Sequence, residues 1–287
     1  MDSNNFDIQP EVANMGNIFE KFDMKNQAVI VTGGAGLLGK QFAKTLAEAG
    51  AGVVVADVML EKAEEVARGL RASGYQAIAV QVDVTDQHSV ENLVAKTIQE
   101  YGILSALINS AALDPKFDQE HAGQHNNNFE DYPVDMFRSA LDVNLTGMFL
   151  CCQAAVKEML KQKKGSIVNI CSTYGLVGPD QRLYEREGQP KQFKPVFYTV
   201  SKAGVLGLTK YLATYYMGTQ IRANALTPGG VYNQHDEMFT ERYSARTVLG
   251  RMAEQDEMNG ACLFLASDAS SYMTGANLVV DGGWTAW

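Results

Sequence analysis

A tyrosine and a lysine stand four residues apart in the stretch Tyr198-Thr199-Val200-Ser201-Lys202. At this spacing both side chains lie on one face of a helix. A phenol titrates near pH ~10, so it can serve as a base at neutral pH only where a nearby cation favours the phenolate. The spacing alone also arises by chance. The pair indicates acid–base catalysis only if other polar residues accompany it.

Two such residues accompany the pair, one at the carboxyl edge of the predicted sheet and one inside a predicted helix. Ser172 follows the apolar run Ser166–Ile170, which predicts a strand that ends just before it. Asn144 lies inside the helical pattern Val134–Lys161, where a short amide side chain competes with the backbone for hydrogen bonds. Both join the tyrosine and the lysine as candidate catalytic residues.

A glycine-rich turn follows the first apolar run, in Val31-Thr32-Gly33-Gly34-Ala35-Gly36-Leu37-Leu38-Gly39. Its spacing, Gly34-x-Gly36-x-x-Gly39, is typical of turns that bind dinucleotides. Glycine is needed because a Cβ would keep the backbone amides from a pyrophosphate resting on the next helix N-terminus. The residues expected against the cofactor here are Gly33, Gly36, Leu37, Leu38 and Gly39.

An acidic residue, Asp57, ends the next predicted strand, about 20 residues beyond the turn, where a carboxylate would bond the adenosine ribose. That carboxylate would repel a 2′-phosphate, and residues 33–39 contain no Arg or Lys. NAD is therefore predicted over NADP.

Short apolar runs alternate with longer helical patterns along the chain. The predicted strands are Ala28–Val31, Gly52–Ala56, Ala77–Val82, Ala106–Ile108, Ser166–Ile170, Ile221–Leu226 and Asn277–Val280. The predicted helices are Leu38–Ala49, Leu60–Ala72, Ser89–Tyr101, Val134–Lys161, Val200–Tyr216 and Glu254–Ala266. This alternation predicts the α/β class: a Rossmann-type, doubly wound parallel sheet of about seven strands in a single domain.

Composition excludes several functions. The formal charge is −9 and the pI is near 5.0, which argues against a nucleic-acid partner. No apolar run approaches the ~18 residues that span a bilayer, and the polar N-terminus is not a signal peptide, so we expect a cytoplasmic protein without a membrane partner. The four cysteines lack metal-ligand spacing, and we expect buried thiols and no metal.

Three segments depart from the alternating pattern. Residues 1–24 predict an N-terminal arm, which leaves 25–287 as the catalytic domain. Two long polar loops are predicted at 114–133, which contains His121, and at 179–195, which contains Arg182. Loops of this length in a compact domain usually serve function, and both follow predicted strands.

Taken together, these motifs resemble the short-chain dehydrogenase/reductase family in its compact, single-domain branch. The resemblance runs from Thr32 to Trp284 and extends to four further motifs: Asp83 at a strand end, Asn109-Ser110-Ala111-Ala112, Ser172 with Tyr198 and Lys202, and Pro228-Gly229-Gly230. Some stretches are similar to members labelled gluconate 5-dehydrogenase-like or flagellin-modification protein A.

The resemblance implies a role for each matching residue. Tyr198 would be the acid/base, Lys202 would lower its pKa and bind the nicotinamide ribose, Ser172 would bond the reacting oxygen, and Asn144 would hold a water in a proton relay. The implied cofactor contacts are Asp83, Val84, Asn109, Ala111, Pro228, Gly229 and Val231. The implied assembly is a homodimer or homotetramer.

Three positions depart from the family pattern. Leu37 stands where the compact branch has glycine, and Gly36 gives a spacing more typical of the extended, nucleotide-sugar branch. Ala112 replaces the usual glycine of its motif. The interval from Ser172 to Tyr198 is longer than usual because the 179–195 loop is inserted, so we expect that loop to shape the substrate pocket.

The resulting prediction is an NAD(H)-dependent oxidoreductase that acts on a secondary alcohol or ketone. The polar loops favour a sugar, sugar acid or activated sugar, with Tyr174, Arg182 and His121 as candidate substrate contacts. The alternatives are a nucleotide-sugar epimerase or dehydratase, a non-catalytic dinucleotide-binding protein, and a ketoacyl-carrier-protein reductase.

Overall fold

A seven-stranded parallel sheet forms the centre of the computed structural model, which describes residues 17–114, 127–186 and 188–287. The strands are β1 (Ala28–Thr32), β2 (Gly52–Asp57), β3 (Ala77–Gln81), β4 (Ala106–Asn109), β5 (Lys164–Ile170), β6 (Gln220–Pro228) and β7 (Asn277–Val280). Their order is β3-β2-β1-β4-β5-β6-β7. The direction of winding reverses between β1 and β4, where folds of this class bind ligands.

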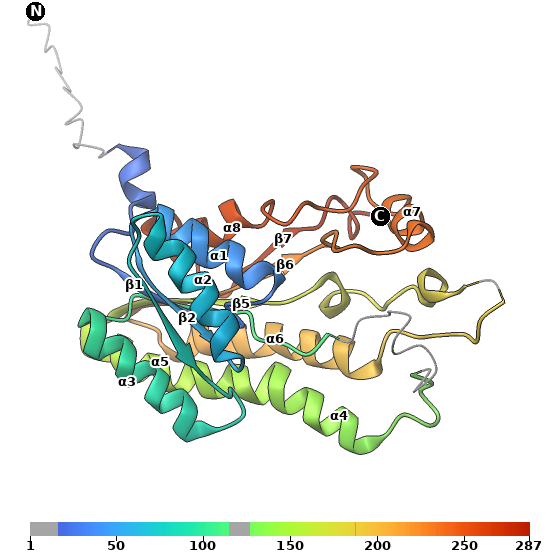
Figure 1. Ribbon diagram of the computed structural model, residues 1–287, viewed down its shortest axis with the longest axis horizontal. Helices are drawn as coiled ribbons and strands as arrows, with labels where there is room; N and C mark the ends of the chain where they lie inside the picture. The colour runs from blue at the N-terminus through green and yellow to red at the C-terminus, as the bar shows by residue number, and fades with distance from the viewer. Residues whose placement is uncertain (1–16, 115–126, 187) are drawn as a thin grey trace, which may run out of the picture.

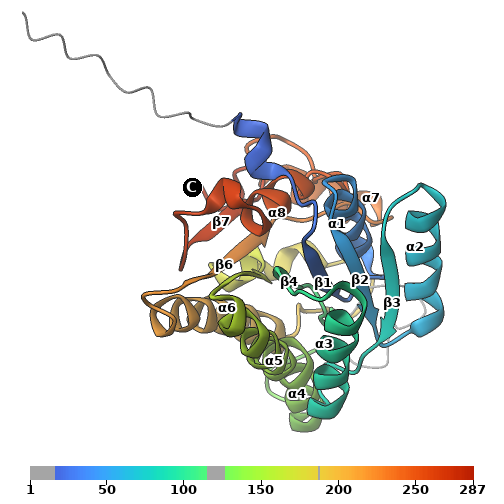
Figure 2. The ribbon, with the colours of Figure 1, turned by 90° about the vertical axis from the view of Figure 1, so that its left-hand side faces the viewer.

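Helices cover both faces of the sheet (Figures 1 and 2). One face packs against α3 (Gln87–Tyr101), α5 (Gly147–Gln162) and α6 (Val196–Tyr215). The other packs against α1 (Leu37–Glu48), α2 (Leu60–Ala72) and α8 (Asn259–Ala266). Because both faces are covered, β1 and β2 are buried along their whole length, which explains their continuous apolar sequences. The predicted α/β class and single domain are confirmed.

One long helical rod runs beneath the sheet, from α4 (Val134–Leu141) through the π-helical turn η2 (Asp142–Thr146) into α5 (Figure 1). By length and composition alone this rod could cross a membrane. Its buried side chains, including Met148, Cys151 and Met159, instead pack in the core beneath the sheet.

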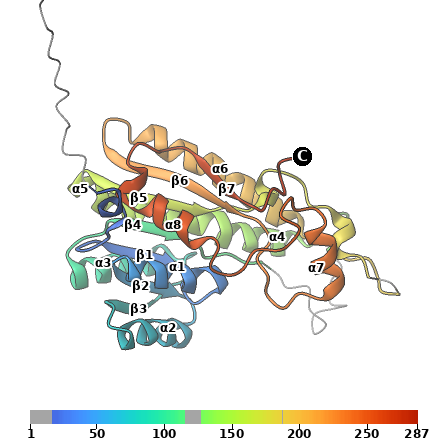
Figure 3. The same cartoon turned by 90° about the horizontal axis from the view of Figure 1, so that it is seen from above.

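The site edge of the molecule is the edge where the parallel strands have their carboxyl ends. The 179–195 segment, with the short helix η4 (Gln181–Tyr184), projects beyond this edge and lies beside α7 (Glu237–Ser244) (Figures 1 and 3). This loop therefore lies at the predicted end of the sheet, next to a helix that comes about 50 residues later in the chain.

The structure corrects three sequence predictions. Helix α7 was not predicted, because its sequence Glu-Met-Phe-Thr-Glu-Arg-Tyr-Ser has a weak apolar pattern. Helix α8 begins at Asn259 rather than Glu254, since Glu257 accepts hydrogen bonds from the Glu254 N–H and from the Arg251 guanidinium and so closes a turn there. Helix α6 begins at Val196, one turn earlier than predicted.

The N-terminal segment is described only from residue 17. The short 3₁₀ helix η1 (Ile18–Phe22) leaves Ile18 and Phe19 exposed, and the chain first enters the core at Met24. The four cysteines are free and buried, as predicted.

Candidate active site

The glycine-rich turn between β1 and α1 leaves no room for side chains. Gly33 has a φ of +62°, and a Cβ on it would lie 2.8 Å from the Ala111 Cα. A Cβ on Gly39 would lie 2.0 Å from the Gly33 carbonyl oxygen. Helix α1 starts after Gly36 without a side-chain cap, so its first N–H groups suit a bound phosphate.

Asp57, at the end of β2, stands beside this turn. Its Oδ2 accepts a hydrogen bond from the Ala35 N–H at 3.1 Å, and its Oδ1 accepts one from the Met59 N–H at 3.1 Å. The carboxylate is therefore fixed next to the start of α1 at Leu37 and Leu38. The glycine cradle, the uncapped helix start and this carboxylate fit a dinucleotide.

Asp83 and Val84 follow the carboxyl end of β3. The Asp83 carboxylate accepts hydrogen bonds from the Thr85 hydroxyl at 2.7 Å and the Thr85 N–H at 2.9 Å, and these bonds lower its pKa. Val84 is buried against Gly147 of α5, where a Cβ would lie 2.7 Å from the valine side chain. Asp83 is thus exposed in a locally closed turn, and Val84 packs beneath it.

The side chain of Asn109 turns into the protein. Its Nδ2 donates to Asn169 Oδ1 at 2.9 Å and lies 3.2 Å from Cys152 Sγ, while its buried Oδ1 has no hydrogen-bond partner. The backbone two residues later borders the glycine-rich turn, because the Ala111 N–H donates to Thr32 Oγ1 at 3.3 Å. Asn109 therefore braces β4 against β5, and only the backbone that follows it faces the predicted cofactor groove.

The third part of the predicted groove follows β6, which ends at Pro228. The Gly229 N–H donates to the Val280 carbonyl at 2.9 Å, which extends the pairing with β7. Val231 forms a parallel bridge with Ala253. These contacts hold the Pro228–Val231 segment in an extended path at the site edge.

Tyr198 and Lys202 lie on the same face of α6, as predicted. The Lys202 ammonium is 5.8 Å from the centroid of the Tyr198 ring and donates a hydrogen bond to the Ile170 carbonyl at 2.9 Å. Lys202 is buried, and this loss of hydration lowers its pKa. The strand end of β5 thus helps fix the lysine next to the phenol.

The pKa of Tyr198 lies well above its ordinary value. Burial is the main cause, and the negative charge of Asp114 adds to it, while a hydrogen bond with Ser172 acts in the opposite direction. The net direction is opposite to the one expected from Lys202. In the protein alone, Tyr198 is therefore a neutral phenol at pH 7.

Ser172 and Tyr174 surround the phenol on the β5 side. Ser172 Oγ caps the short helix η3 (Thr173–Gly175) by accepting from the Tyr174 N–H at 3.2 Å. The ring of Tyr174 meets the ring of Tyr198 edge-on, with centroids 6.4 Å apart. The Tyr174 hydroxyl pairs with that of Tyr184 at 3.2 Å, and burial raises the pKa of Tyr174 to about 12. The structure therefore brings the predicted substrate contact Tyr174 next to Tyr198.

Asn144 sits in the π-turn η2, a feature that often marks functional sites in helices. Its Oδ1 accepts from the Leu113 N–H at 2.6 Å, and its Nδ2 donates to the Leu113 carbonyl at 3.1 Å and lies 3.3 Å from Ser201 Oγ. The amide thereby ties the long helix to the chain that leaves β4 and to α6.

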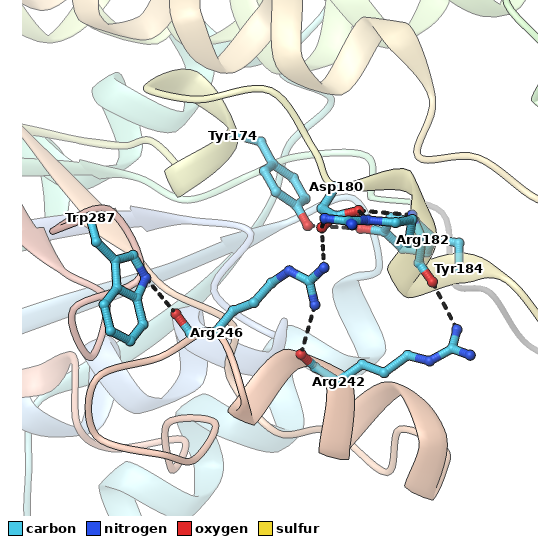
Figure 4. A network of polar contacts seen from close by, with 7 residues as sticks. All are labelled: Tyr174, Asp180, Arg182, Tyr184, Arg242, Arg246 and Trp287. Atoms are coloured by element: carbon cyan, nitrogen blue, oxygen red, sulfur yellow. Dashed lines mark hydrogen bonds and ion pairs between the residues drawn. The ribbon is translucent and has the colours of Figure 1, made fainter.

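The second predicted substrate contact, Arg182, pairs with a carboxylate of its own segment. Arg182 is 76% exposed, and its guanidinium forms a two-point contact with Asp180 at 2.8 and 2.7 Å (Figure 4). The pKa of Asp180 is lowered by these bonds and by Arg246. His121 lies outside the described residues. A carboxylate two residues away neutralises Arg182, so the structure gives no support to its role as a substrate anchor.

The Asp180 contacts belong to a larger network that joins the 179–195 segment to α7 and the C-terminus (Figure 4). Arg246 forms an ion pair with Asp180, and Arg242 donates to the Arg182 carbonyl at 2.8 Å. The indole of Trp287 donates to the Arg246 carbonyl at 3.3 Å. These contacts fix the loop over the site edge from a distant part of the chain.

One residue pair at the site was missed from the sequence. The Lys194 ammonium lies over the Tyr198 ring, 4.1 Å from its centroid, and forms an ion pair with Asp114. The signal was available in part, because Lys194 precedes the tyrosine by four residues just as Lys202 follows it by four. Its partner could not be inferred, since Asp114 is 80 residues away.

Within residues 17–114, 127–186 and 188–287, no three His, Cys, Asp or Glu side chains are grouped so that they could hold a metal ion. Acid–base chemistry by Tyr198, with the cofactor cradle nearby, is what the described arrangement supports.

Comparisons with known proteins show which family the chain resembles. A family model described as enoyl-(acyl carrier protein) reductase matches residues 34–285. The cis-4-hydroxycyclohexanecarboxylate dehydrogenase of Sinomonas cyclohexanicum is 37% identical over 91% of this chain and 97% of its own.

Two solved structures share the fold. A short-chain type dehydrogenase/reductase from Mycobacterium marinum is 31% identical, with a TM-score of 0.81 over 94% of this chain and 99% of its own. A gluconate 5-dehydrogenase from Burkholderia cenocepacia J2315, in complex with NADP and tartrate, is 28% identical, with a TM-score of 0.82 over 94% and 100%. The chain belongs to the short-chain dehydrogenase/reductase family, whose members are nicotinamide-dependent oxidoreductases.

Proposed function

We propose that this protein is an NAD(H)-dependent dehydrogenase of a secondary alcohol, borne by a sugar, a sugar acid or a related cyclic hydroxy compound. The observation that carries the proposal is the grouping of Ser172, Tyr198 and Lys202 at the carboxyl end of β5. The relatives named above act on a cyclic hydroxy acid and on gluconate, and both are substrates with a secondary alcohol.

The residues divide the work by their positions. Tyr198 takes the hydroxyl proton in oxidation and returns it in reduction, and Ser172 hydrogen-bonds the reacting oxygen. Lys202, held by the Ile170 carbonyl, favours the phenolate by its charge and binds the nicotinamide ribose. Asn144 holds a water in a proton relay toward Lys202. The nicotinamide accepts or supplies the hydride when bound.

The raised pKa of Tyr198 gives the two directions opposite pH dependences. Oxidation needs the phenolate, so its rate rises as pH rises toward that pKa. Reduction needs the neutral phenol, which is already the form present at pH 7, so its rate falls only in the alkaline range.

The cofactor preference for NAD rests on Asp57. Its carboxylate is held at the end of β2 by the Ala35 and Met59 N–H groups and would meet a 2′-phosphate with like charge. Replacement of Asp57 by Ser should improve the kcat/KM ratio of NADP⁺ to NAD⁺ by about 10- to 100-fold. Glu61→Gln, which removes an exposed carboxylate from the first turn of α2, should leave that ratio unchanged.

The function itself is tested by NADH formation. Purified protein and NAD⁺ are mixed with a panel of sugars, sugar acids, cyclic hydroxy acids and nucleotide sugars. We expect net NADH with at least one member, and a loss of about 10²- to 10⁴-fold in kcat for Tyr198→Phe. Tight cofactor retention without net NADH would instead favour the epimerase class. Equal rates for both proteins would sink the proposal.

We further propose that the protein is a cytoplasmic homodimer or homotetramer. Large apolar side chains are exposed on the outer faces of α4, α5 and α6, among them Met136, Phe149, Tyr211 and Tyr215. Tyr211 and Tyr215 stack on one another with ring centroids 5.6 Å apart, and grouped exposed apolar side chains are typical of a subunit interface. The four free, buried thiols fit a reducing compartment. Light scattering during gel filtration distinguishes a monomer from a dimer or tetramer.

A further inference from the structure

Lys194 is a buried cation at the active site that acid–base catalysis by Tyr198 does not require. Its side chain is 8% exposed and lies over the face of the Tyr198 ring. Lys202 already supplies a cation close to the same ring. A buried ammonium is costly to keep unless an anion pairs with it, so the site around Lys194 is built to hold a negative group.

Lys194 forms an ion pair in this structure with the carboxylate of Asp114, which is 50% exposed. Asp114 belongs to the chain that follows β4, whereas Lys194 is the last residue but one of the 179–195 segment, which precedes α6. The charge of Asp114 reaches three active-site phenols, since it contributes to the raised pKa values of Tyr174, Tyr184 and Tyr198. A carboxylate therefore already pairs with Lys194 next to the Tyr198 ring.

The position of Lys194 relative to the catalytic tyrosine is fixed by the backbone. Pro195 follows it and restricts it to an extended conformation. The Lys194 N–H donates to Gln181 Oε1 at 2.8 Å, and the Tyr198 N–H donates to the Pro195 carbonyl at 3.1 Å. An anion held by Lys194 would therefore stay at a set distance from the phenol that exchanges the proton.

We propose that Lys194 is the anchor for a carboxylate of the substrate, and that Asp114 occupies the anchor until the substrate carboxylate replaces it. This inference rests on the proposed dehydrogenase function and narrows its substrate to a hydroxy acid, or a keto acid in the reverse direction. The exchange is balanced, because one carboxylate replaces another on the buried ammonium. Asp114, being half exposed, returns to water at little cost.

A neutral alcohol of the same shape gains nothing from this anchor. It binds with the Asp114–Lys194 pair in place and forms no charged contact of its own with the ammonium. A substrate carboxylate, by contrast, forms a charge-assisted hydrogen bond there, which is stronger than a bond between neutral groups. The anchor therefore acts as a selector for anionic substrates.

Binding without turnover tests the anchor independently of the dehydrogenase activity. Calorimetry on the full-length protein with NADH compares cyclohexanecarboxylate, tartrate and gluconate with their amides. We expect at least one acid to bind about 30- to 100-fold more tightly than its amide, and Lys194→Gln to abolish this difference. Lys194→Arg should retain part of it. Lys191→Gln, which removes an exposed lysine of the same segment, should keep all of it.

The Asp114→Asn variant gives a prediction with a distinctive sign. Because Asp114 competes for the anchor, its neutralisation should tighten carboxylate binding about 3- to 10-fold. If Asp114 instead binds substrate hydroxyls, the same variant weakens binding, and the exchange is refuted. The anchor is overturned if no acid binds more tightly than its amide, or if Lys194→Gln weakens acid and amide equally.

Kinetics separates this inference from the proposed function. Hydroxy acids and their amides serve as substrates for wild type and Lys194→Gln. The variant should have a higher KM for the acids, whereas kcat for the acids and both kcat and KM for the amides should stay within about three-fold of wild type. An equal fall of kcat for acids and amides would show that Lys194 acts on the Tyr198 phenol and would refute the anchor. If NADH forms only from neutral alcohols, the dehydrogenase function stands and the anchor is overturned. If acids bind selectively but no NADH forms, the anchor stands and the dehydrogenase function is overturned.

Discussion

The side-chain amide of Asn144 pairs with both backbone groups of Leu113, accepting from its N–H at 2.6 Å and donating to its carbonyl at 3.1 Å. The amide thus satisfies both backbone groups of Leu113, as a neighbouring strand would, in the chain that follows β4. Asp114, the ion-pair partner of Lys194, is the next residue in the chain. The contact therefore also helps to fix the position of Asp114.

The Asn144→Ala variant should lose about 1–3 kcal/mol of unfolding free energy, because the fully buried amide loses its hydrogen bonds to both backbone groups of Leu113. Activity should fall with it, since Leu113 and Asp114 lose their support. Urea unfolding and steady-state kinetics measure the two effects. Ser201→Ala removes only the third partner of the amide and should cost less. Unchanged stability of Asn144→Ala, with kcat alone reduced, would assign the residue solely to the proton relay.

The Gly39→Ala variant should lose cofactor binding or fail to fold, because its Cβ would lie 2.0 Å from the Gly33 carbonyl oxygen. Overpacking of this kind costs about 1–3 kcal/mol or more. Gly69→Ala is the matched control in α2, where a Cβ meets nothing within 4 Å. It should stabilise the protein by about 0.5–1 kcal/mol. NADH fluorescence titration and thermal unfolding give the comparison, and normal NADH affinity in Gly39→Ala would contradict it.

The Asp180→Asn variant should loosen the 179–195 segment, because both Arg182 and Arg246 lose their carboxylate partner (Figure 4). We expect KM for the substrate to rise about three- to ten-fold and amide exchange in residues 180–195 to accelerate. Asp135→Asn breaks a largely exposed pair with Arg138 and should change neither quantity. Equal exchange rates in wild type and Asp180→Asn would refute the clamp.

Alkaline pH should destabilise the fold through its buried thiols and phenols. Burial raises the pKa of Cys151 to about 12, whereas a thiol in the unfolded chain titrates near ~8.5. The contribution of this group is complete below pH ~8.5 and is lost as pH rises toward ~12, because only the unfolded state ionises in that window.

Urea unfolding at pH 7 and pH 10 measures this loss. The decline in stability between the two pH values should be smaller in Cys151→Ala than in wild type by roughly 1–2 kcal/mol. Cys262→Ala, which removes another fully buried thiol with a raised pKa, should reproduce the difference. Identical declines in all three proteins would contradict the assignment.

Local patterns in the sequence determined the fold and the relative placement of the candidate catalytic residues Tyr198 and Lys202. Continuous apolar runs predicted seven strands because a parallel sheet is buried on both faces. The Tyr198–Lys202 spacing predicted a shared helix face because that relationship needs only one helix. The glycines of the first turn were predictive for the same reason, since their constraint arises within a few residues.

Tertiary structure alone decided which polar loop residues meet. Arg182 was a candidate substrate contact in the sequence, but the fold places it on Asp180 with Arg246 nearby. Lys194 was not predicted as a site residue, but the fold buries it against Tyr198, where it pairs with Asp114 from the chain after β4. Charges on loops carry no periodic signal, and their pairing depends on how distant segments pack. The proximity of Tyr198 and Lys202 could therefore be predicted from the chain, while the candidate anchor for the substrate emerged only from the fold.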